Sequence, residues 1–473
     1  MKENNNIKAL KSGVWYTAAN FITKSIGFIT TPIFTRLLTH ADYGLFSNYI
    51  SWQNTFLVFA TLGLGTSFIS ARFDFSDDFD GYISSSLVLS TLVTLAWTIV
   101  IHLFPDSFSR FMGLDIKYIN IMMAYFFTYS AVDMFLVRER YLYKYKISVA
   151  VSLLLVVSSA FLSVLLVLNM ENKLLGRIAG DAAPTILIGI FLYGLLIRRG
   201  KHINTDYWKY ALPICLPYIP HVLSLSVLNS VDKMMITKIC GPEENALYSV
   251  AYSCGAVITV MVSSLNTAFS PWLGEKLNEK KYDEINRVSR YYILLFVCSA
   301  GGIMLIAPEL LLFMGGRSYT GAKYVMPPVA FGCVCQFLYT LYVNVEQFNK
   351  KTVGMAIASM IAAISNYTLN YFFIPRFGYI AAAYTTLASF MILLFIHMLL
   401  VKQMGLKNIY PGKFIVVVLL AVSVYTLLVN VLYANNGIRY CVLAVYAVIS
   451  VYVLLKQKSI FMLLFRKRNN GSL

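Results

Sequence analysis

Long apolar stretches separated by short polar breaks dominate the chain. Blocks such as 147–170, 352–375 and 377–401 contain no Asp, Glu, Lys or Arg. A helix needs about 20 such residues to cross the roughly 30 Å of hydrocarbon in a bilayer. The pattern therefore predicts an all-α polytopic membrane protein. About fourteen transmembrane helices are expected, near 12–35, 44–70, 82–104, 118–137, 147–168, 174–197, 210–235, 246–272, 291–312, 324–344, 353–374, 378–400, 414–433 and 439–455.

Composition and charge agree with this prediction. The chain is 58% hydrophobic and 13% charged, whereas a soluble protein has about a quarter charged residues. Roughly three times as many of the 39 Lys and Arg residues fall in segments on the side of the N-terminus as in the opposite loops. Short cytoplasmic loops carry such an excess, so we expect both termini in the cytoplasm. Topology and anionic lipids explain the net charge of +17, and no nucleic-acid partner is expected.

No residue pattern indicates a metal site or a catalytic motif. The seven cysteines lie in or at the ends of the predicted spans and lack zinc or redox spacing, so we interpret them as packing residues and expect no metal. The sequence contains no HExxH, GxSxG or phosphate-loop motif. We expect no cofactor, and coupling to protons or sodium is left open.

The chain contains an internal repeat. At an offset of 202 residues, "TRLLTHADYGLFS" (35–47) aligns with "TKICGPEENALYS" (237–249) without a gap. At the same offset Gly176 aligns with Gly378. This shift equals six spans, an even number, so the two halves have the same orientation in the membrane. Parallel repeats of this kind occur in transporters, where the substrate path runs between the halves.

Three segments carry a resemblance to a known family. "PIFTRLLTHADYGLFSNYISW", "VDKMMITKICGPEENALYSVAY" and, above all, "NYTLNYFFIPRFGYIAAAYTTLASF" (366–390) resemble the polysaccharide transporter family of lipid-linked oligosaccharide flippases. That family belongs to a superfamily that also contains lipid II flippases and multidrug and toxin extrusion antiporters. The resemblance covers nearly the whole chain, roughly residues 10 to 455.

The resemblance implies both an architecture and an activity. It implies an N-lobe over residues 1–200, a C-lobe over 201–402, each of six helices around a central cavity, and two extra C-terminal helices with a basic tail over 403–473. It also implies that an undecaprenyl-pyrophosphate-linked oligosaccharide is moved from the inner to the outer leaflet of a bacterial cytoplasmic (inner) membrane by alternating access, for surface polysaccharide synthesis. The expected partners are this lipid-linked substrate, the bilayer, and polysaccharide polymerase and chain-length proteins.

Charged side chains within the spans are the first candidates for substrate contact. Lys24 lies about 18 Å along the first predicted helix, too deep to reach either surface easily, so it faces the bundle or water. It either contacts the pyrophosphate or locks helices by pairing with Asp133 or Asp181. Arg177 and Asp181 are four residues apart and are expected to pair with each other. Asp133 is expected to pair with the nearby Arg138.

The seventh predicted span combines charge with prolines. Asp232 and Lys233 end an uncharged run that starts at Tyr210, and they either line a polar cavity near the outer mouth or lie at the membrane interface. Consecutive helix residues point about 100° apart, so these two cannot neutralise each other side by side. Three prolines within eight residues predict a bent or broken helix, and hence a hinge: Pro213, Pro217 and Pro220.

Polar uncharged residues complete the expected cavity wall. Asn54 in the second span, and Asn366 with Asn370 in the eleventh, must face protein or water because unsatisfied amides are costly in hydrocarbon. Two alternatives remain open at this point. A cation-coupled multidrug antiporter would favour acidic cavity residues, whereas a membrane glycosyltransferase or polymerase would need larger outward loops than this chain has. We therefore predict a transporter, not an enzyme.

Overall fold

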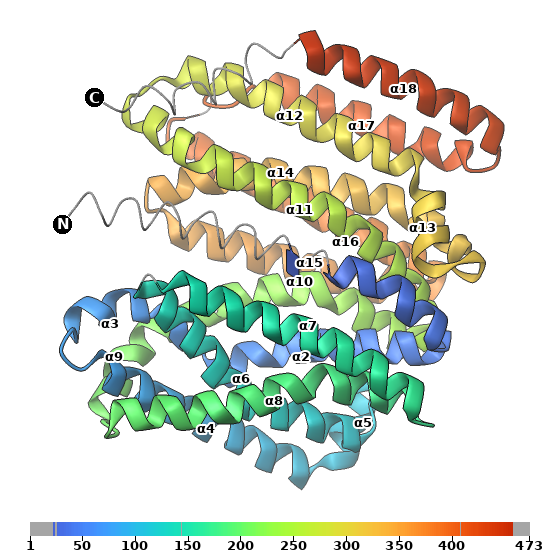
Figure 1. Cartoon of the computed structure of the whole chain (residues 1–473). Helices are drawn as coiled ribbons and strands as arrows, with labels where there is room; N and C mark the ends of the chain where they lie inside the picture. Colours follow the sequence, from blue (N-terminus) through green and yellow to red (C-terminus); the bar gives the residue numbers. More distant parts are fainter. Residues whose placement is uncertain (1–21, 24–25, 143, 407, 457–473) are drawn as a thin grey trace. The chain divides into compact units, whose positions relative to one another are not determined.

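The computed structural model describes residues 22–23, 26–142, 144–406 and 408–456, and its secondary structure over these residues is helical, without strands (Figure 1). The prediction of an all-α membrane protein is therefore confirmed. Eleven of the described helical segments are long and apolar enough to cross a membrane. A helix also occupies two further expected spans, α2 (His40–Thr61) and α18 (Asn436–Lys456). The first expected span lies only partly within the described residues.

The chain divides into two compact units. Unit 1 comprises residues 1–249 and 370–379, and unit 2 comprises 250–369 and 380–473. The helices that lie wholly in unit 1 are α2, α3 (Phe68–Asp74), α4 (Phe79–Leu103), α5 (Pro105–Met112), α6 (Ile116–Tyr141), α7 (Tyr145–Asn169), α8 (Lys173–Gly200), α9 (Asp206–Cys215) and α10 (Ile219–Ile239), with the short 3-10 helices η1 (Leu64–Thr66) and η2 (Leu216–Tyr218).

Unit 2 contains the remaining helices, of which α11 and α16 begin in unit 1 and α15 ends there. Its helices are α11 (Pro242–Asn278), α12 (Tyr282–Leu305), α13 (Ala307–Gly315), α14 (Met326–Phe348), α15 (Thr352–Phe377), α16 (Tyr379–Gln403), α17 (Gly412–Leu432) and α18, with the 3-10 segment η3 (Arg317–Val325). The division into lobes at 1–200 and 201–402, which the sequence predicts, is not the same as the division into these two units. It stays a prediction.

Two expected spans are interrupted rather than continuous. The second was expected over 44–70, but α2 ends at Thr61 because Leu62 and Gly63 adopt left-handed φ angles of 49° and 60°. The seventh is broken as expected: Pro213 lies in α9, Pro217 in η2 and Pro220 in the first turn of α10. Proline lacks the amide donor that an unbroken helix needs.

Helix α8 packs closely against α6 and α7 through small residues. A Cβ on Gly180 would lie 2.3 Å from the Cα of Ser163 in α7, and one on Gly189 would lie 2.6 Å from the Cβ of Thr128 in α6. Lipid is as apolar as the helix surfaces, so close backbone packing at such residues stabilises helix pairs in membranes.

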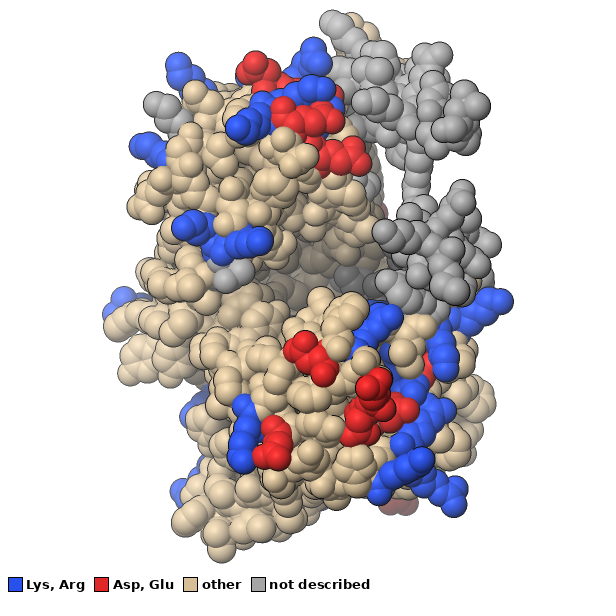
Figure 2. Space-filling view, turned by 90° about the vertical axis from the view of Figure 1, so that its left-hand side faces the viewer, with Lys and Arg blue, Asp and Glu red and all other residues tan. Residues whose placement is uncertain are grey.

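Helices α3 and α9 lie at one end of unit 1 (Figure 1), and ion pairs join charged residues at this charged end. On the face shown in Figure 2, Lys and Arg side chains lie beside Asp and Glu side chains rather than in a patch of one sign. Arg138 at the end of α6 donates to both carboxylate oxygens of Asp80 at 2.6 and 2.9 Å. Lys209 pairs with Asp206 at 2.8 Å at the start of α9.

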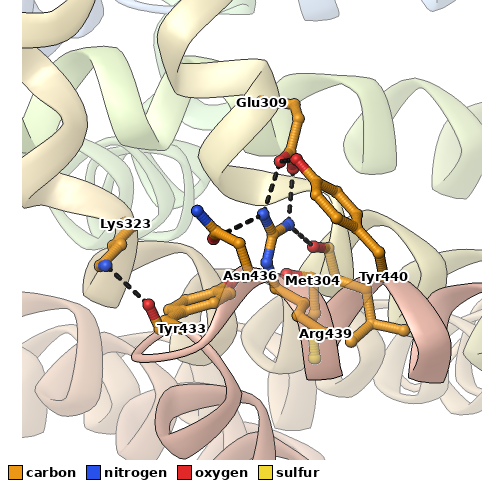
Figure 3. Close-up of polar contacts among 8 residues, drawn as sticks. Met304, Glu309, Lys323, Tyr433, Asn436, Arg439 and Tyr440 are labelled. Atoms are coloured by element: carbon orange, nitrogen blue, oxygen red, sulfur yellow. Dashed lines mark hydrogen bonds and ion pairs between the residues drawn. The ribbon is translucent and has the colours of Figure 1, made fainter.

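In unit 2, polar contacts fasten the C-terminal helix pair to α12 and α13 (Figure 3). Arg439 of α18 is 1% exposed and donates to both carboxylate oxygens of Glu309 in α13, at 2.5 and 2.6 Å. Tyr433 donates to the carbonyl of Met304 at 2.5 Å, and Lys323 donates to the carbonyl of Tyr433 at 3.0 Å. The two helices beyond the sequence repeat are thus anchored within this unit.

Candidate functional site

A cavity of about 380 Å³ opens among three helices of unit 1. Ligand pockets in proteins measure roughly 300–1,000 Å³, so this one suits a small group or part of a larger headgroup. Its lining combines amides, hydroxyls, aromatic rings and aliphatic side chains, and comprises Asn54, Leu57, Val58, Thr61 and Gly63 near α2, Tyr129 and Asp133 of α6, and Tyr218, Ile219, Val222, Leu225, Ser226 and Asn229 near α10.

Helical periodicity explains how the lining residues come together. Asn54, Val58 and Thr61 recur at spacings of four and three, so they share one face of α2. Tyr129 and Asp133 share a face of α6 in the same way. The break at η2 ends at Tyr218, so the interruption of the seventh span places Tyr218 at the cavity wall.

Apart from the tyrosines, Asp133 is the one ionisable residue in the described lining of the cavity. It forms neither a hydrogen bond nor an ion pair with the described residues, and Lys and Arg are absent from the described lining. A carboxylate accepts hydrogen bonds at both oxygens and donates none when ionised. The cavity therefore offers acceptor capacity for a ligand with hydroxyl or amine groups.

The expected pairing of Asp133 with Arg138 is wrong. Arg138 instead binds Asp80 and its neighbour Glu139. Five residues along a helix correspond to a turn of about 140° around the axis, so Asp133 and Arg138 point in different directions. Asp133 faces the cavity, whereas Arg138 faces the charged end of unit 1.

Asp232 lies in a closed polar cluster rather than in the described cavity. Its side chain is buried, with 2% exposed. Tyr248 donates to Oδ2 at 2.6 Å, and the amide of Asn370 donates to Oδ1 at 2.6 Å. These two donors belong to α11 and α15. The Asp232 carboxyl group thus links α10 to the parts of α11 and α15 that belong to unit 1.

Of the two predicted lysines, the structure describes one. Lys233 follows Asp232 in α10 and is half-buried. Lys24 lies outside the described residues, so its proposed contact with a pyrophosphate stays a prediction.

Arg177 and Asp181 approach each other as expected, with Nη1 and Oδ1 3.4 Å apart. The shorter contact of Arg177 is with the hydroxyl of Ser163, at 2.7 Å. The rings of Phe34 and Phe46 each lie 4.0 Å from the guanidinium carbon. This arrangement holds the cation by hydrogen bonds and ring faces.

The two predicted amides of the eleventh span have different partners. Asn366 is fully buried in unit 2 and donates to the hydroxyl of Thr386 at 3.0 Å. Asn370, also fully buried, belongs to unit 1 and binds Asp232. Of the three predicted amides, Asn54 is the one at the described cavity. Its side chain is exposed and has no hydrogen-bond partner among the described residues.

The sequence did not identify several cavity residues, among them Tyr129, Tyr218, Ser226 and Asn229. A signal existed for two of them: Ser226 and Asn229 lie three apart within an uncharged run, which places two polar side chains on one helix face. The tyrosines had no distinguishing signal, because the chain contains 33 of them.

A comparison with known families decides the classification. The sequence model of a family described as "Polysaccharide biosynthesis protein" matches residues 9–276, more than half of the chain. The chain belongs to this polysaccharide biosynthesis protein family. The MatE family model also matches, over residues 217–372. These matches confirm the resemblance that the three sequence segments indicated.

Relatives and solved structures extend this classification. A protein of the Lsg locus of Haemophilus influenzae is 23% identical over 370 residues, which cover 76% of this chain and 89% of that protein. A membrane protein of Methanocaldococcus jannaschii is 21% identical over 460 residues, which cover 88% of this chain and 88% of that protein. A structure of the lipid II flippase MurJ in an inward closed conformation matches with a TM-score of 0.71 at 15% identity, over 95% of this chain and all of that one.

A second solved structure has a similar fold. An inward-facing multidrug resistance MATE family transporter of the MOP superfamily matches with a TM-score of 0.61 at 15% identity, over 81% of this chain and 98% of that one. At such identities the likeness shows the fold. The protein is thus a multi-pass membrane protein with the fold of MOP-superfamily flippases and transporters.

Proposed function

We propose that this protein is a flippase that moves an undecaprenyl-pyrophosphate-linked oligosaccharide from the inner to the outer leaflet of a bacterial cytoplasmic membrane. Its product would supply surface polysaccharide synthesis. The observation that carries the proposal is a cavity whose largely apolar wall also bears amide, hydroxyl and carboxyl groups, in a member of the polysaccharide biosynthesis family. A cavity of this kind replaces the water that a sugar headgroup loses on entering the membrane.

The three parts of such a substrate need different surroundings. The sugars need hydroxyl, amide and aromatic partners, which the cavity provides through residues such as Asn54, Ser226 and Tyr129. The polyprenyl tail needs only contact with lipid. The pyrophosphate needs a cation, and we propose Lys24 for this role because the sequence places it midway along the first span.

We propose that alternating access involves the seventh span. Its helix is interrupted at η2, where Pro217 removes a backbone donor, and Tyr218 beside this break lines the cavity. A change of angle at this break would move part of the cavity wall. The proposed orientation has both termini in the cytoplasm, and polymerase and chain-length proteins would receive the product.

Reconstitution tests this function directly. The purified protein in liposomes should transfer undecaprenyl-pyrophosphate N-acetylglucosamine between leaflets, measured as sugar that becomes accessible to a membrane-impermeant oxidant. Lys24→Ala should slow transfer, whereas Lys402→Ala, an exposed lysine at the end of α16, should not. If the lipid is transferred at the same rate in liposomes with and without the protein, the proposal is contradicted. Repeating the assay with proton and sodium gradients tests coupling.

One observation favours a second function. Asp133 forms no ion pair with the described residues, although the charge of Arg140 acts on it. A cation-coupled multidrug antiporter would use such an acidic group to bind cations. Export of cationic dyes from cells that express the protein would support this alternative. Dye export that is lost in Asp133→Asn, together with no lipid transfer in liposomes, would replace the flippase proposal.

A further inference from the structure

The cavity of unit 1 brings polar and aromatic groups into one wall. Asn54 and Asp133 present an amide and a carboxylate that lack hydrogen-bond partners among the described residues. The aromatic side chains of Tyr129 and Tyr218 stand in the same wall. A sugar ring presents hydroxyl donors at its edge and C–H groups on its faces. Carboxylate and amide oxygens accept from the hydroxyls, and the negative face of an aromatic ring attracts the C–H groups.

The charge of the cavity wall bears on which sugars would bind there. Asp133 contributes a carboxyl group and the described lining contains no Lys or Arg, so the cation whose charge acts on Asp133, Arg140 of the same helix, stands outside the lining. A second negative charge brought into the same cavity would be repelled, and the apolar helices around it weaken the screening by water. An amine on the ligand would be attracted. A neutral hydroxyl would donate to the carboxylate oxygens.

We infer that this cavity binds the sugar part of the substrate, and that it favours neutral or amine-bearing sugars over sugars with a carboxylate. The inference rests on the proposed flippase function and assigns a substrate class to it. It also separates two tasks. The pyrophosphate binds away from Asp133, at cations outside this cavity, because like charges would otherwise meet.

The experiment compares three lipids in liposomes that contain the full-length protein. The probes are undecaprenyl pyrophosphate linked to N-acetylglucosamine, to glucosamine and to glucuronic acid, which are neutral, cationic and anionic in the sugar. Membrane-impermeant periodate cleaves the vicinal diols of all three sugars, so its consumption reports transfer. The wild-type protein should transfer the first two lipids roughly tenfold faster than the third.

Two variants assign the preference to the cavity. Asp133→Asn keeps the shape and removes the charge, so it should accelerate glucuronic acid transfer and bring the three rates close together. Asp106→Asn removes an exposed carboxylate in the first turn of α5, away from the cavity lining, and should leave the ratio unchanged. Thermal unfolding in detergent identifies a variant that fails to fold. If a variant fails to fold, the ratio of the wild-type transfer rates for the three lipids still tests whether the protein prefers neutral or amine-bearing sugars.

The outcomes are distinct. Equal wild-type rates for the three lipids, or an unchanged ratio in folded Asp133→Asn, would overturn the inference and leave the flippase function standing. No transfer of any lipid above the protein-free rate would overturn the flippase function and this inference with it. A wild-type preference that Asp133→Asn abolishes and Asp106→Asn retains would establish the assignment.

Discussion

The hydroxyl groups of Ser47 and Ser249 share a hydrogen bond of 2.7 Å, although 202 positions separate them. This separation equals the offset of the sequence repeat, so the two serines occupy equivalent places in α2 and α11. Beside them, the amide of Asn245 donates to the backbone carbonyl of Gly44 at 2.8 Å. The starts of two equivalent helices therefore pack against each other where the repeat is clearest.

This contact makes Gly44 a sensitive position. A Cβ there would lie 1.7 Å from the carbonyl oxygen of Pro242, a backbone atom that cannot move aside alone. Gly44→Ala should lower the free energy of unfolding by about 1–3 kcal/mol through overpacking, measured by unfolding in detergent. Gly194→Ala in α8 is the matched control, because its Cβ would meet nothing within 4 Å. Equal losses in the two variants would contradict the tight contact.

The sequence could predict the helices but not all of their contacts. Apolar blocks located the spans, and the prolines of the seventh span located its interruption at Pro217. The end of α2 at Thr61 was missed because leucine rarely adopts the left-handed φ of Leu62, although Gly63 beside it is of a type that often ends a helix.

Side-chain direction was the main limit at the candidate site. Lipid and protein interiors are both apolar, so hydrophobic periodicity does not separate the lipid-facing side of a span from its packed side. Asn54 lines the cavity of unit 1, and its contact with a substrate stays a prediction. Asp133 and Asp232 carry the same side chain, yet one lines the cavity and the other binds Tyr248 and Asn370. That difference depends on neighbouring helices distant in the sequence.

The bond between Asn370 and Asp232 leads to a second prediction. Asp232 is 2% exposed and accepts hydrogen bonds from Tyr248 and Asn370, so loss of either donor leaves a buried carboxyl group less satisfied. Asn370→Ala should lower the free energy of unfolding by about 1.5–3 kcal/mol. Asn169→Ala is the control, because that exposed amide bonds only within its own helix, to Leu165. Asn370→Asp should destabilise more than Asn370→Ala, since it adds a like charge.

The anchor of the C-terminal helix should respond to acid. Burial raises the pKa of Glu309, but hydrogen bonds from Arg439 and Tyr440 outweigh it and hold the pKa below the ordinary value of 4.5. A carboxylate with a lowered folded-state pKa stabilises the fold above its unfolded pKa and loses that contribution as pH falls through the folded pKa. Docking of α18 on α13 should therefore weaken below about pH 4.5.

Hydrogen exchange of the α18 amides across this pH range measures the effect. Glu309→Gln supplies the comparison, because it keeps the shape and cannot ionise. Its exchange should be faster at neutral pH and should lack the additional acceleration in acid. Identical acid profiles for the wild type and Glu309→Gln would show that another group controls the docking of α18.

Glu346 and His397 form a second buried pair in unit 2. Nδ1 of His397 lies 2.8 Å from Oε1 of Glu346, and their side chains are 3% and 0% exposed. The other carboxylate oxygen, Oε2, is buried and has no hydrogen-bond partner among the described residues. Removing the histidine would leave the carboxylate without its only observed side-chain partner. His397→Leu should therefore cost about 3–5 kcal/mol of unfolding free energy.

A double-mutant cycle separates the pair from the size of each side chain. Replacing both members removes the buried polar groups together, and well-packed apolar residues can substitute for such a pair at little cost. The double variant Glu346→Leu with His397→Leu should consequently be more stable than His397→Leu alone, which gives a coupling energy of about 0.5–3 kcal/mol. Additive losses would indicate that the carboxylate is already neutral or finds another partner, since an unpaired charge produces the penalty.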